Sequence, residues 1–184
     1  MKKNRTYLSV TSAVCAAALW AALSLVGCVG VPQGNRISRL ERETATENEA
    51  AKSTVEKLIK ALDDRDAASV REMFSPYALE NSPDLDEKIR EMFEYYPGMD
   101  EEYECINPSS RSSDYGTVVH IINPVIFAES GGERYDIIIC RYLRNDEDPS
   151  MEGVHLVEII KEKDKPEGFK RMNEDDMPGV YVGE

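Results

Sequence analysis

Basic residues are scarce in this sequence of 184 residues, in which 22 lysines and arginines face 35 aspartates and glutamates. Because proteins that bind nucleic acid neutralise phosphates with clustered lysine and arginine, the formal net charge of −13 excludes that class of partner. The same charge argues against a domain that lies flat on an anionic lipid surface. We interpret the acidic excess as the solvated surface of a soluble domain, with attraction to cationic ligands or metal ions as the alternative.

The sequence also has few histidines and cysteines, and it has no glycine-rich motif typical of phosphate binding. The two histidines, His120 and His155, and the four cysteines do not have the spacing of a zinc site. Gly131-Gly132 has the composition of a hairpin turn, not that of a phosphate loop between a strand and a helix. No serine or cysteine stands in an arrangement typical of a catalytic nucleophile. We therefore predict neither a metal site nor a cofactor.

Three acidic clusters are the remaining candidates for a cation site. They lie at residues 100–102, 146–148 and 174–176. None follows the loop pattern of an EF-hand, in which carboxylates at fixed positions converge on one calcium ion. We expect solvated loops at all three places.

The first 28 residues have the pattern of an export signal. Lys2, Lys3 and Arg5 precede an apolar stretch at 13–23, which is short for a permanent membrane span. The stretch ends in Leu25-Val26-Gly27-Cys28, which resembles the bacterial lipobox. That resemblance implies a signal peptide at 1–27, lipid such as palmitate on Cys28, and a location at the extracytoplasmic face of the cell membrane. The alternative is an uncleaved anchor in which Cys28 is an ordinary apolar residue.

Two cysteines remain in the rest of the chain, Cys105 and Cys140. Both fall in predicted strands, and an exported protein can keep a disulfide. The sequence leaves two interpretations open: a bridge across the sheet, or two separate buried thiols that pack as small apolar side chains.

Helical signals follow a predicted flexible tether at 28–45, and the domain itself is predicted at 46–184. The first helix is expected to have Thr46 as its N-cap, in a capping box, and to end near Asp63-Asp64. A second, short helix is expected from Asp66 to Ser75-Pro76, since proline disfavours helix in the residue before it. A third begins at Ser82, an N-cap followed by proline, and ends at Pro97-Gly98. Apolar residues at helical spacing predict the buried face of the first helix; they are Ala51, Val55, Leu58, Ile59 and Leu62.

The second half of the chain changes to a strand-like pattern. We predict four strands, near 101–106, 116–128, 134–144 and 153–163, with a Gly-Gly hairpin between the second and third. Three helices followed by a four-stranded antiparallel sheet define the class α+β. The strand centres are apolar on both faces, unlike a sheet with one solvated face. One face is expected to pack on the helices, and the other on the C-terminal segment, a partner or a second copy, so we predict a homodimer through the sheet face.

The run Val55 to Ser75 resembles the opening helices of NTF2-like (SnoaL-like) domains. The segments Asp84-Leu85-Asp86-Glu87, Tyr115-Gly116, Asn145 to Pro149 and Met177 to Tyr181 are similar to those of DUF5104 lipoproteins, a family without an attached function. The resemblance covers about 49–184. It implies a cone, in which a curved sheet wraps around helices and encloses a cavity. The chain departs from many NTF2-like domains in the short stretch 77–81, where others insert a strand or hairpin.

The implied cavity suggests which residues would meet a ligand. Candidate lining residues are Tyr96, His120, Tyr135 and Tyr142, with ordinary core packing as the alternative. Our first hypothesis is a surface-anchored, non-catalytic module that binds a small apolar ligand or an envelope protein. The second is a small cone-fold enzyme, an isomerase, dehydratase or hydrolase, acting on an apolar molecule. An apolar cavity with His120 opposite a buried carboxylate would favour the enzyme.

Overall fold

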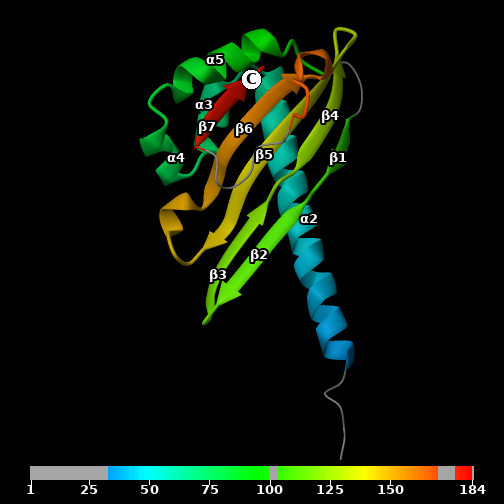
Figure 1. The fold of residues 1–184 in the computed structure, drawn as a ribbon, viewed down its shortest axis with the longest axis vertical. Coiled ribbons are helices and arrows are strands. Elements are labelled where there is room, and N and C mark those ends of the chain that lie inside the picture. The colour runs from blue at the N-terminus through cyan, green and yellow to red at the C-terminus, as the bar shows by residue number, and fades with distance from the viewer. Residues whose placement is uncertain (1–32, 100–102, 170–176, 184) are drawn as a thin grey trace, which may run out of the picture. The chain divides into compact units, whose positions relative to one another are not determined.

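The computed structural model describes residues 33–99, 103–169 and 177–183 (Figure 1). By its internal contacts the chain divides into two units, Met1–Glu43 and Thr44–Glu184. The described residues of the first unit are helical. The second unit is an α+β structure, in which helices precede a mixed sheet of seven strands. This confirms the predicted fold class, and the sheet has more strands than predicted.

The first helix, α2, spans Gln33–Asp63 and begins well before the cap predicted at Thr46. Residues 33–45, predicted as a flexible tether, are therefore helical, whereas 28–32 lie outside the described residues. Residues 35–43 contain neither proline nor glycine and are rich in good helix formers, which accounts for the longer helix. The predicted buried face is confirmed, because Ala51, Val55, Leu58, Ile59 and Leu62 are all at most 7% exposed.

Three shorter helices follow where two were predicted. They are α3 (Ala67–Glu72), α4 (Pro76–Asn81) and α5 (Leu85–Tyr95). Asp66, where the sequence predicted the second helix to start, caps α3 by accepting a hydrogen bond from the Ser69 amide. Ser75-Pro76 ends α3 and also starts α4, since Ser75 Oγ accepts from the Ala78 amide and proline occupies the first turn. Ser75-Pro76, predicted only as the end of one helix, is thus also the start of the next, and α4 occupies the stretch 77–81.

The sheet is built around β5 (Glu133–Asn145), the longest strand. One edge of β5 pairs with β3 (Thr117–Ile122) and β4 (Val125–Ser130), and the other pairs with β6 (Gly153–Lys161). β1 (Glu104–Ile106) pairs with β4, and β2 (Ser109–Asp114) pairs with β3. β7 (Gly179–Val182) adds to β6 in parallel, and all other pairings are antiparallel. The predicted Gly-Gly hairpin is confirmed between β4 and β5, where Gly131 and Gly132 both have positive φ.

Two Asn-Pro dipeptides divide what would otherwise be two long strands. The pairs Ile106↔Val125 and Ser109↔Ile122 have the same register, so Asn107-Pro108 lies opposite Asn123-Pro124. The Asn123 amide still donates to Pro108 O at 2.8 Å, and Ile139 N donates to Pro124 O at 3.0 Å. Proline cannot donate to the ladder, so pairing is interrupted at these positions. The predicted strand 116–128 therefore exists as β3 and β4 in one register.

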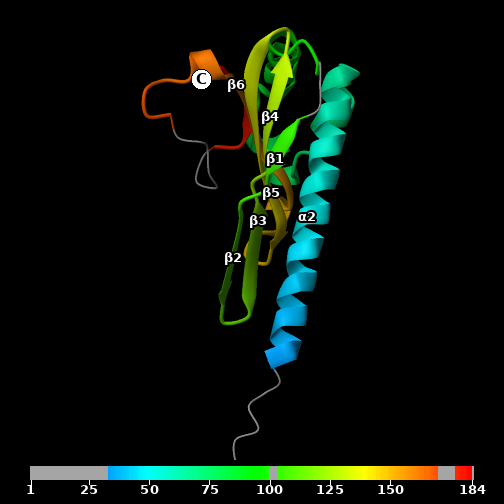
Figure 2. The same cartoon turned by 90° about the vertical axis from the view of Figure 1, so that its right-hand side faces the viewer.

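The two faces of the sheet have different covers, which Figure 2 shows edge-on. On one face Ile137, Ile139 and Val157 join the core made with α2 and α5. On the other face, the segment after β6 lies over the sheet, and Lys165 Nζ reaches 2.8 Å from Asp136 Oδ2. Ile138 and Ile160 on this face are at most 1% exposed. The segment after β6 thus contacts this face, and the homodimer through the sheet face stays a prediction.

Candidate functional site

A cavity of about 570 Å³ opens between α2, α3 and the sheet. Its walls combine charged side chains with apolar ones. The lining residues are Lys57, Lys60, Ala61, Asp64, Asp66, Ser69, Glu72, Met73, Phe74, Arg141, Glu152, Gly153 and Val154. The volume is within the range of about 300 to 1,000 Å³ typical of small-molecule sites.

The wall formed by α3 is fixed to the sheet through main-chain hydrogen bonds. Val154 N donates to Met73 O at 2.9 Å, and Ser75 N donates to Val154 O at 2.8 Å. Gly153 allows this approach, because a Cβ there would lie 2.9 Å from Ser75 Cα. The turn between α2 and α3 contains Arg65 in the left-handed region (φ 53°), and its Nη1 donates to Phe93 O at 2.6 Å. Hydrogen bonds to β6 and α5 therefore hold this wall of the cavity in place.

Arg141 projects from β5 toward α2 at the cavity. Its Nη1 donates to Thr54 Oγ1, which in turn donates to Ala50 O at 2.7 Å. Its Nε is buried and has no hydrogen-bond partner, and no acidic residue of the described chain pairs with the guanidinium. Burial lowers the pKa of Arg141 below its ordinary value. A cation in this position is the natural counterpart of an anionic group on a ligand.

Most of the other charged side chains of the cavity form ion pairs or hydrogen bonds with neighbouring residues. Lys60 pairs with Asp64, a contact that raises the pKa of Lys60. The amide and the hydroxyl of Ser69 both donate hydrogen bonds to the Asp66 carboxylate, and these bonds lower the pKa of Asp66. Glu152 Oε1 accepts from the Asn145 amide at 3.1 Å. These ties leave Arg141 as the most deeply placed cation available to a ligand.

The four residues predicted to line a pocket lie at three separate places, none of them in this cavity. Tyr96 and Tyr135 are together in the core, 1% and 2% exposed, with ring centroids 5.2 Å apart in an edge contact. Tyr135 is six residues along β5 from Arg141, a distance of about 20 Å. Tyr96 and Tyr135 thus pack in the core, which was the alternative to lining a pocket.

His120 faces α2, but far from the cavity. Its Nε2 lies 2.9 Å from Glu47 Oε1, and Ser109 Oγ donates to Glu47 Oε2 at 2.9 Å. Glu47 is ten residues before Lys57 on α2, so this cluster is about 15 Å along the helix from the cavity. The constellation that would favour an enzyme, His120 opposite a buried carboxylate in an apolar cavity, is not what the described residues form.

A β-bulge determines where Tyr142 and His155 point. The register shifts between Cys140↔Leu156 and Arg141↔Val154, which leaves His155 as the extra residue of β6. Val154 consequently joins the helix-facing core, and the His155 ring contacts Tyr142 at 5.6 Å on the other face. Tyr77 of α4 stacks on the same imidazole, with centroids 6.1 Å apart. Tyr142 thus follows Arg141 in sequence but lies on the opposite face.

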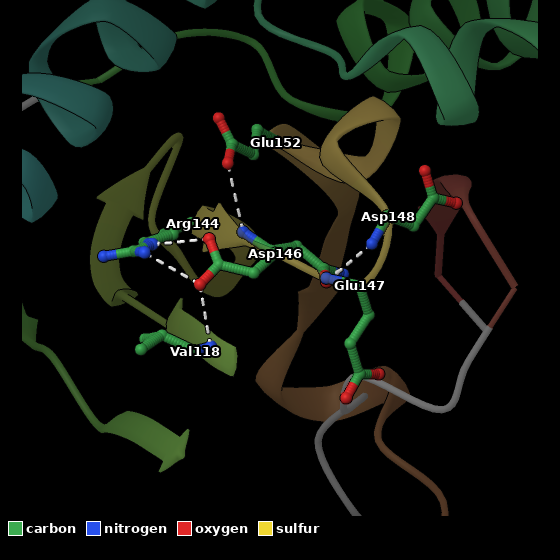
Figure 3. Close-up of polar contacts among 7 residues, drawn as sticks. Val118, Arg144, Asp146, Glu147, Asp148 and Glu152 are labelled. Carbon is green, nitrogen blue, oxygen red and sulfur yellow. Dashed lines mark hydrogen bonds and ion pairs between the residues drawn. The ribbon is translucent and has the colours of Figure 1, made fainter. Parts of the chain in front are cut away.

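The acidic loop at 146–148 is held by its own neighbours (Figure 3). Arg144 binds the Asp146 carboxylate through Nε and Nη2 at 2.6 and 2.7 Å, and the Val118 amide adds a third bond at 2.9 Å. These bonds lower the pKa of Asp146. The side chains of Glu147 and Asp148 point away from Asp146 and from each other. Within the described residues no three acidic, histidine or cysteine side chains converge on a metal position.

Both cysteines of the predicted domain are free thiols. Cys105 is exposed on β1, and Cys140 is buried on β5. Cys105 pairs with Ile126, whose partner on β5 is Ile137, so the two cysteines are two strands apart and offset along the sheet. The structure therefore has two separate thiols, and only Cys140 is buried as a small apolar side chain. Although Cys105 is exposed, neighbouring atoms partly desolvate its sulfur, and this raises the pKa of the thiol above its ordinary value.

The predicted leader, Cys28, and the acidic clusters at 100–102 and 174–176 lie outside the described residues. Within the described part, no helix combines the length and the apolar character needed to cross a membrane.

Arg141 is the functional candidate that the sequence reasoning missed. It is the one charged residue in the apolar run from Ile137 to Leu143. A charge inside an apolar strand is unusual enough to mark a position of interest. What the run could not show was which face of the sheet would carry it.

The family relationship follows from the sequence of this same region. The profile of a family described as Domain of unknown function (DUF5104) matches residues 57–162, more than half of the chain. No curated protein matches the sequence. All the lining residues of the cavity fall inside the matched range, whereas the predicted leader and β7 fall outside it. The chain belongs to the DUF5104 family.

Proposed function

We propose that this protein is a surface-anchored, non-catalytic module that binds a small molecule in the cavity around Arg141. The observation that supports it is the cavity itself, about 570 Å³ with both apolar and charged walls. Pockets that bind small ligands combine an apolar lining with a few placed polar groups. In this proposal the fold is an NTF2-like cone, with α2 packed on the concave face of a sheet whose strands are bent by bulges and Asn-Pro breaks.

The cavity provides less support for the enzyme alternative. Neither histidine of the chain lines it, since His120 pairs with Glu47 and His155 contacts Tyr142 on the opposite face. Of its carboxylates, Asp66 has a lowered pKa, the opposite of the raised pKa that general acid catalysis at neutral pH would use.

Ligand binding is tested with a library of small apolar and amphiphilic molecules, followed by NMR. We expect chemical-shift changes that map to Ala61, Met73 and Val154 on the cavity walls. Glu72→Trp should block the cavity and abolish these changes, because Glu72 is an exposed lining residue. Glu80→Trp is the matched control, since Glu80 is exposed on α4 and outside the cavity. Binding elsewhere, or equal binding to both variants, would contradict the proposal.

We further propose that lipid on Cys28 holds the protein at the extracytoplasmic face of the cell membrane. Two or more acyl chains suffice for stable anchoring, at about 0.8 kcal/mol per buried methylene. Cys28→Ala should prevent lipid attachment and release the protein from the membrane fraction or leave it in the wrong place. Cys15→Ala, in the predicted leader, is the matched control and should be processed and anchored normally. A Cys28→Ala protein that stays membrane-bound and normally processed would disprove the anchor.

A further inference from the structure

The chemical class of the ligand can be inferred from the charge that the cavity leaves uncompensated. Arg141 is half-buried, and among the described residues its side chain has one hydrogen-bond partner, the neutral hydroxyl of Thr54. Its buried Nε has no partner in the part of the chain that the structure describes. A guanidinium removed from water without a carboxylate is costly, and this cost is offset when an anion binds. The fork of N–H groups matches a planar anion with two oxygens.

A second cation stands beside it on α2. Lys57 lines the same cavity, and no ion pair with it forms within the described residues. Lys60, one turn further along α2, is by contrast occupied by Asp64. Arg141 from the sheet and Lys57 from the helix therefore supply positive charge from two walls.

The rest of the cavity limits the ligand further. Ala61, Met73, Phe74 and Val154 give it an apolar surface. Glu72 and Glu152 also line it, and their negative charge would repel a dianion such as phosphate more than a monoanion. A monovalent head group joined to an apolar body satisfies both conditions.

We propose that Arg141 and Lys57 bind the carboxylate of a small amphiphilic organic acid, whose apolar part lies against Ala61, Met73 and Val154. This inference rests on the ligand-binding function proposed above and specifies the ligand class at that site. It does not depend on the membrane anchor.

The test uses four probes with the full domain: hexanoate, 1-hexanol, hexylammonium and inorganic phosphate. Binding is followed by calorimetry and by NMR shifts of the cavity residues. We expect hexanoate to bind at least tenfold more tightly than 1-hexanol, and hexylammonium and phosphate to bind more weakly than hexanoate. Raising the salt concentration should weaken hexanoate binding and leave 1-hexanol binding nearly unchanged.

Matched variants locate the charge that matters. Arg141→Gln should lower hexanoate affinity at least tenfold and remove its advantage over 1-hexanol. Arg134→Gln, on the same strand but exposed and outside the cavity, should leave both affinities unchanged. Lys57→Gln alters an exposed helix position and should lower hexanoate affinity several-fold while keeping the fold. This variant keeps the proposal testable should Arg141→Gln fail to fold.

Two outcomes would overturn the inference and leave the binding module intact. In one, 1-hexanol binds in the cavity as tightly as hexanoate, and the Arg141 and Lys57 variants bind hexanoate like the wild type. In the other, phosphate displaces hexanoate and binds more tightly, which would exclude the carboxylate. Failure of all four probes and of the library to perturb the cavity would overturn the binding function as well.

Discussion

Gly153 has a backbone conformation that the cavity wall requires. Its φ of +130° is outside the range that residues with a side chain adopt readily. A Cβ would also lie 2.9 Å from Ser75 Cα and 3.0 Å from Ser75 N, and both contacts are with main-chain atoms that cannot swing aside. Two independent costs therefore meet at this residue, one from conformation and one from packing.

Gly153→Ala should lower the free energy of unfolding by on the order of 2 to 3 kcal/mol, measured by urea denaturation. Gly132→Ala is the control, because Gly132 also has positive φ (75°) but nothing within 4 Å of its would-be Cβ. That variant should lose about 1 kcal/mol, the conformational part alone. Equal losses in the two variants would show that the contact with Ser75 relaxes without cost.

At the residue scale, the sequence predicted which residues are buried and where a helix starts. It did not predict which residues distant in the chain contact one another. The buried face of α2 follows from spacing alone, and the start of α3 at Asp66 was also predicted from the sequence. His120 faces α2, yet which turn of the helix it meets depends on how the helix lies along the sheet. Its partner Glu47 is distant in the chain, so no local pattern could identify the pair.

At the element scale, polar contacts of Glu47 connect α2 with the β2–β3 hairpin. All six residues of β2 are exposed, and β3 is only partly buried over Thr117–His120. Glu47 contacts both strands, through Ser109 on β2 and His120 on β3. Because β2 is exposed and has no apolar residue, the polar contacts of Glu47 help to hold the hairpin against α2.

Glu47→Ala should lower the free energy of unfolding by about 1 to 2 kcal/mol, since it removes a hydrogen bond to a charged group. It should also speed amide hydrogen exchange in β2 and β3 more than in β5 and β6. Glu49→Ala, at an exposed position of the same helix, is the control and should change stability by less than about 0.5 kcal/mol. Uniformly faster exchange across the sheet would show that Glu47 does not act on the hairpin.

The elements that the sequence reasoning missed share a physical cause. β2 reads Ser-Ser-Arg-Ser-Ser-Asp and has no apolar residue, so its strand state comes from pairing with β3 and not from burial. β7 is four residues long and depends on the edge of β6. α4 has good caps but only six residues, too few for a periodic pattern. Tertiary contacts decide all three.

At the scale of the whole molecule, the α+β class followed from the change of period along the chain. What packs on the second face of the sheet could not be predicted in this way. The C-terminal segment, a partner and a second copy all fitted an apolar surface equally well. The segment after β6 contacts the second face through Lys165, which pairs with Asp136, and it contacts the start of β5 through Lys163, which pairs with Glu133. Those partners are identifiable only once the segment folds back over β5. The homodimer through the sheet face stays a prediction.

Tyr95 joins the end of α5 to β6 and to the segment that follows β6. Its hydroxyl, at the end of α5, donates to Asp164 Oδ2 at 2.8 Å and accepts from the Lys161 amide of β6 at 3.0 Å. Burial, together with the bond to Asp164, raises the pKa of Tyr95 to about 12 from an ordinary value near 10. The folded state therefore holds this proton more tightly than the unfolded state does.

This pKa difference predicts an alkaline loss of stability that can be assigned to one residue. The contribution of Tyr95 is fully present below pH 10 and is lost as the pH rises from 10 to 12. The raised pKa values of Lys60, Lys163 and Lys165 add a loss above about pH 10.5, so the wild type must be compared with Tyr95→Phe.

Urea unfolding at pH 9 to 12 should show a shallower decline in the free energy of unfolding for Tyr95→Phe than for the wild type. Tyr115→Phe removes a fully exposed hydroxyl and should follow the wild-type curve. If Tyr95→Phe declines as steeply as the wild type, the hydroxyl ionises as readily in the folded state as in the unfolded one, and the junction of α5, β6 and the segment after it does not depend on that proton.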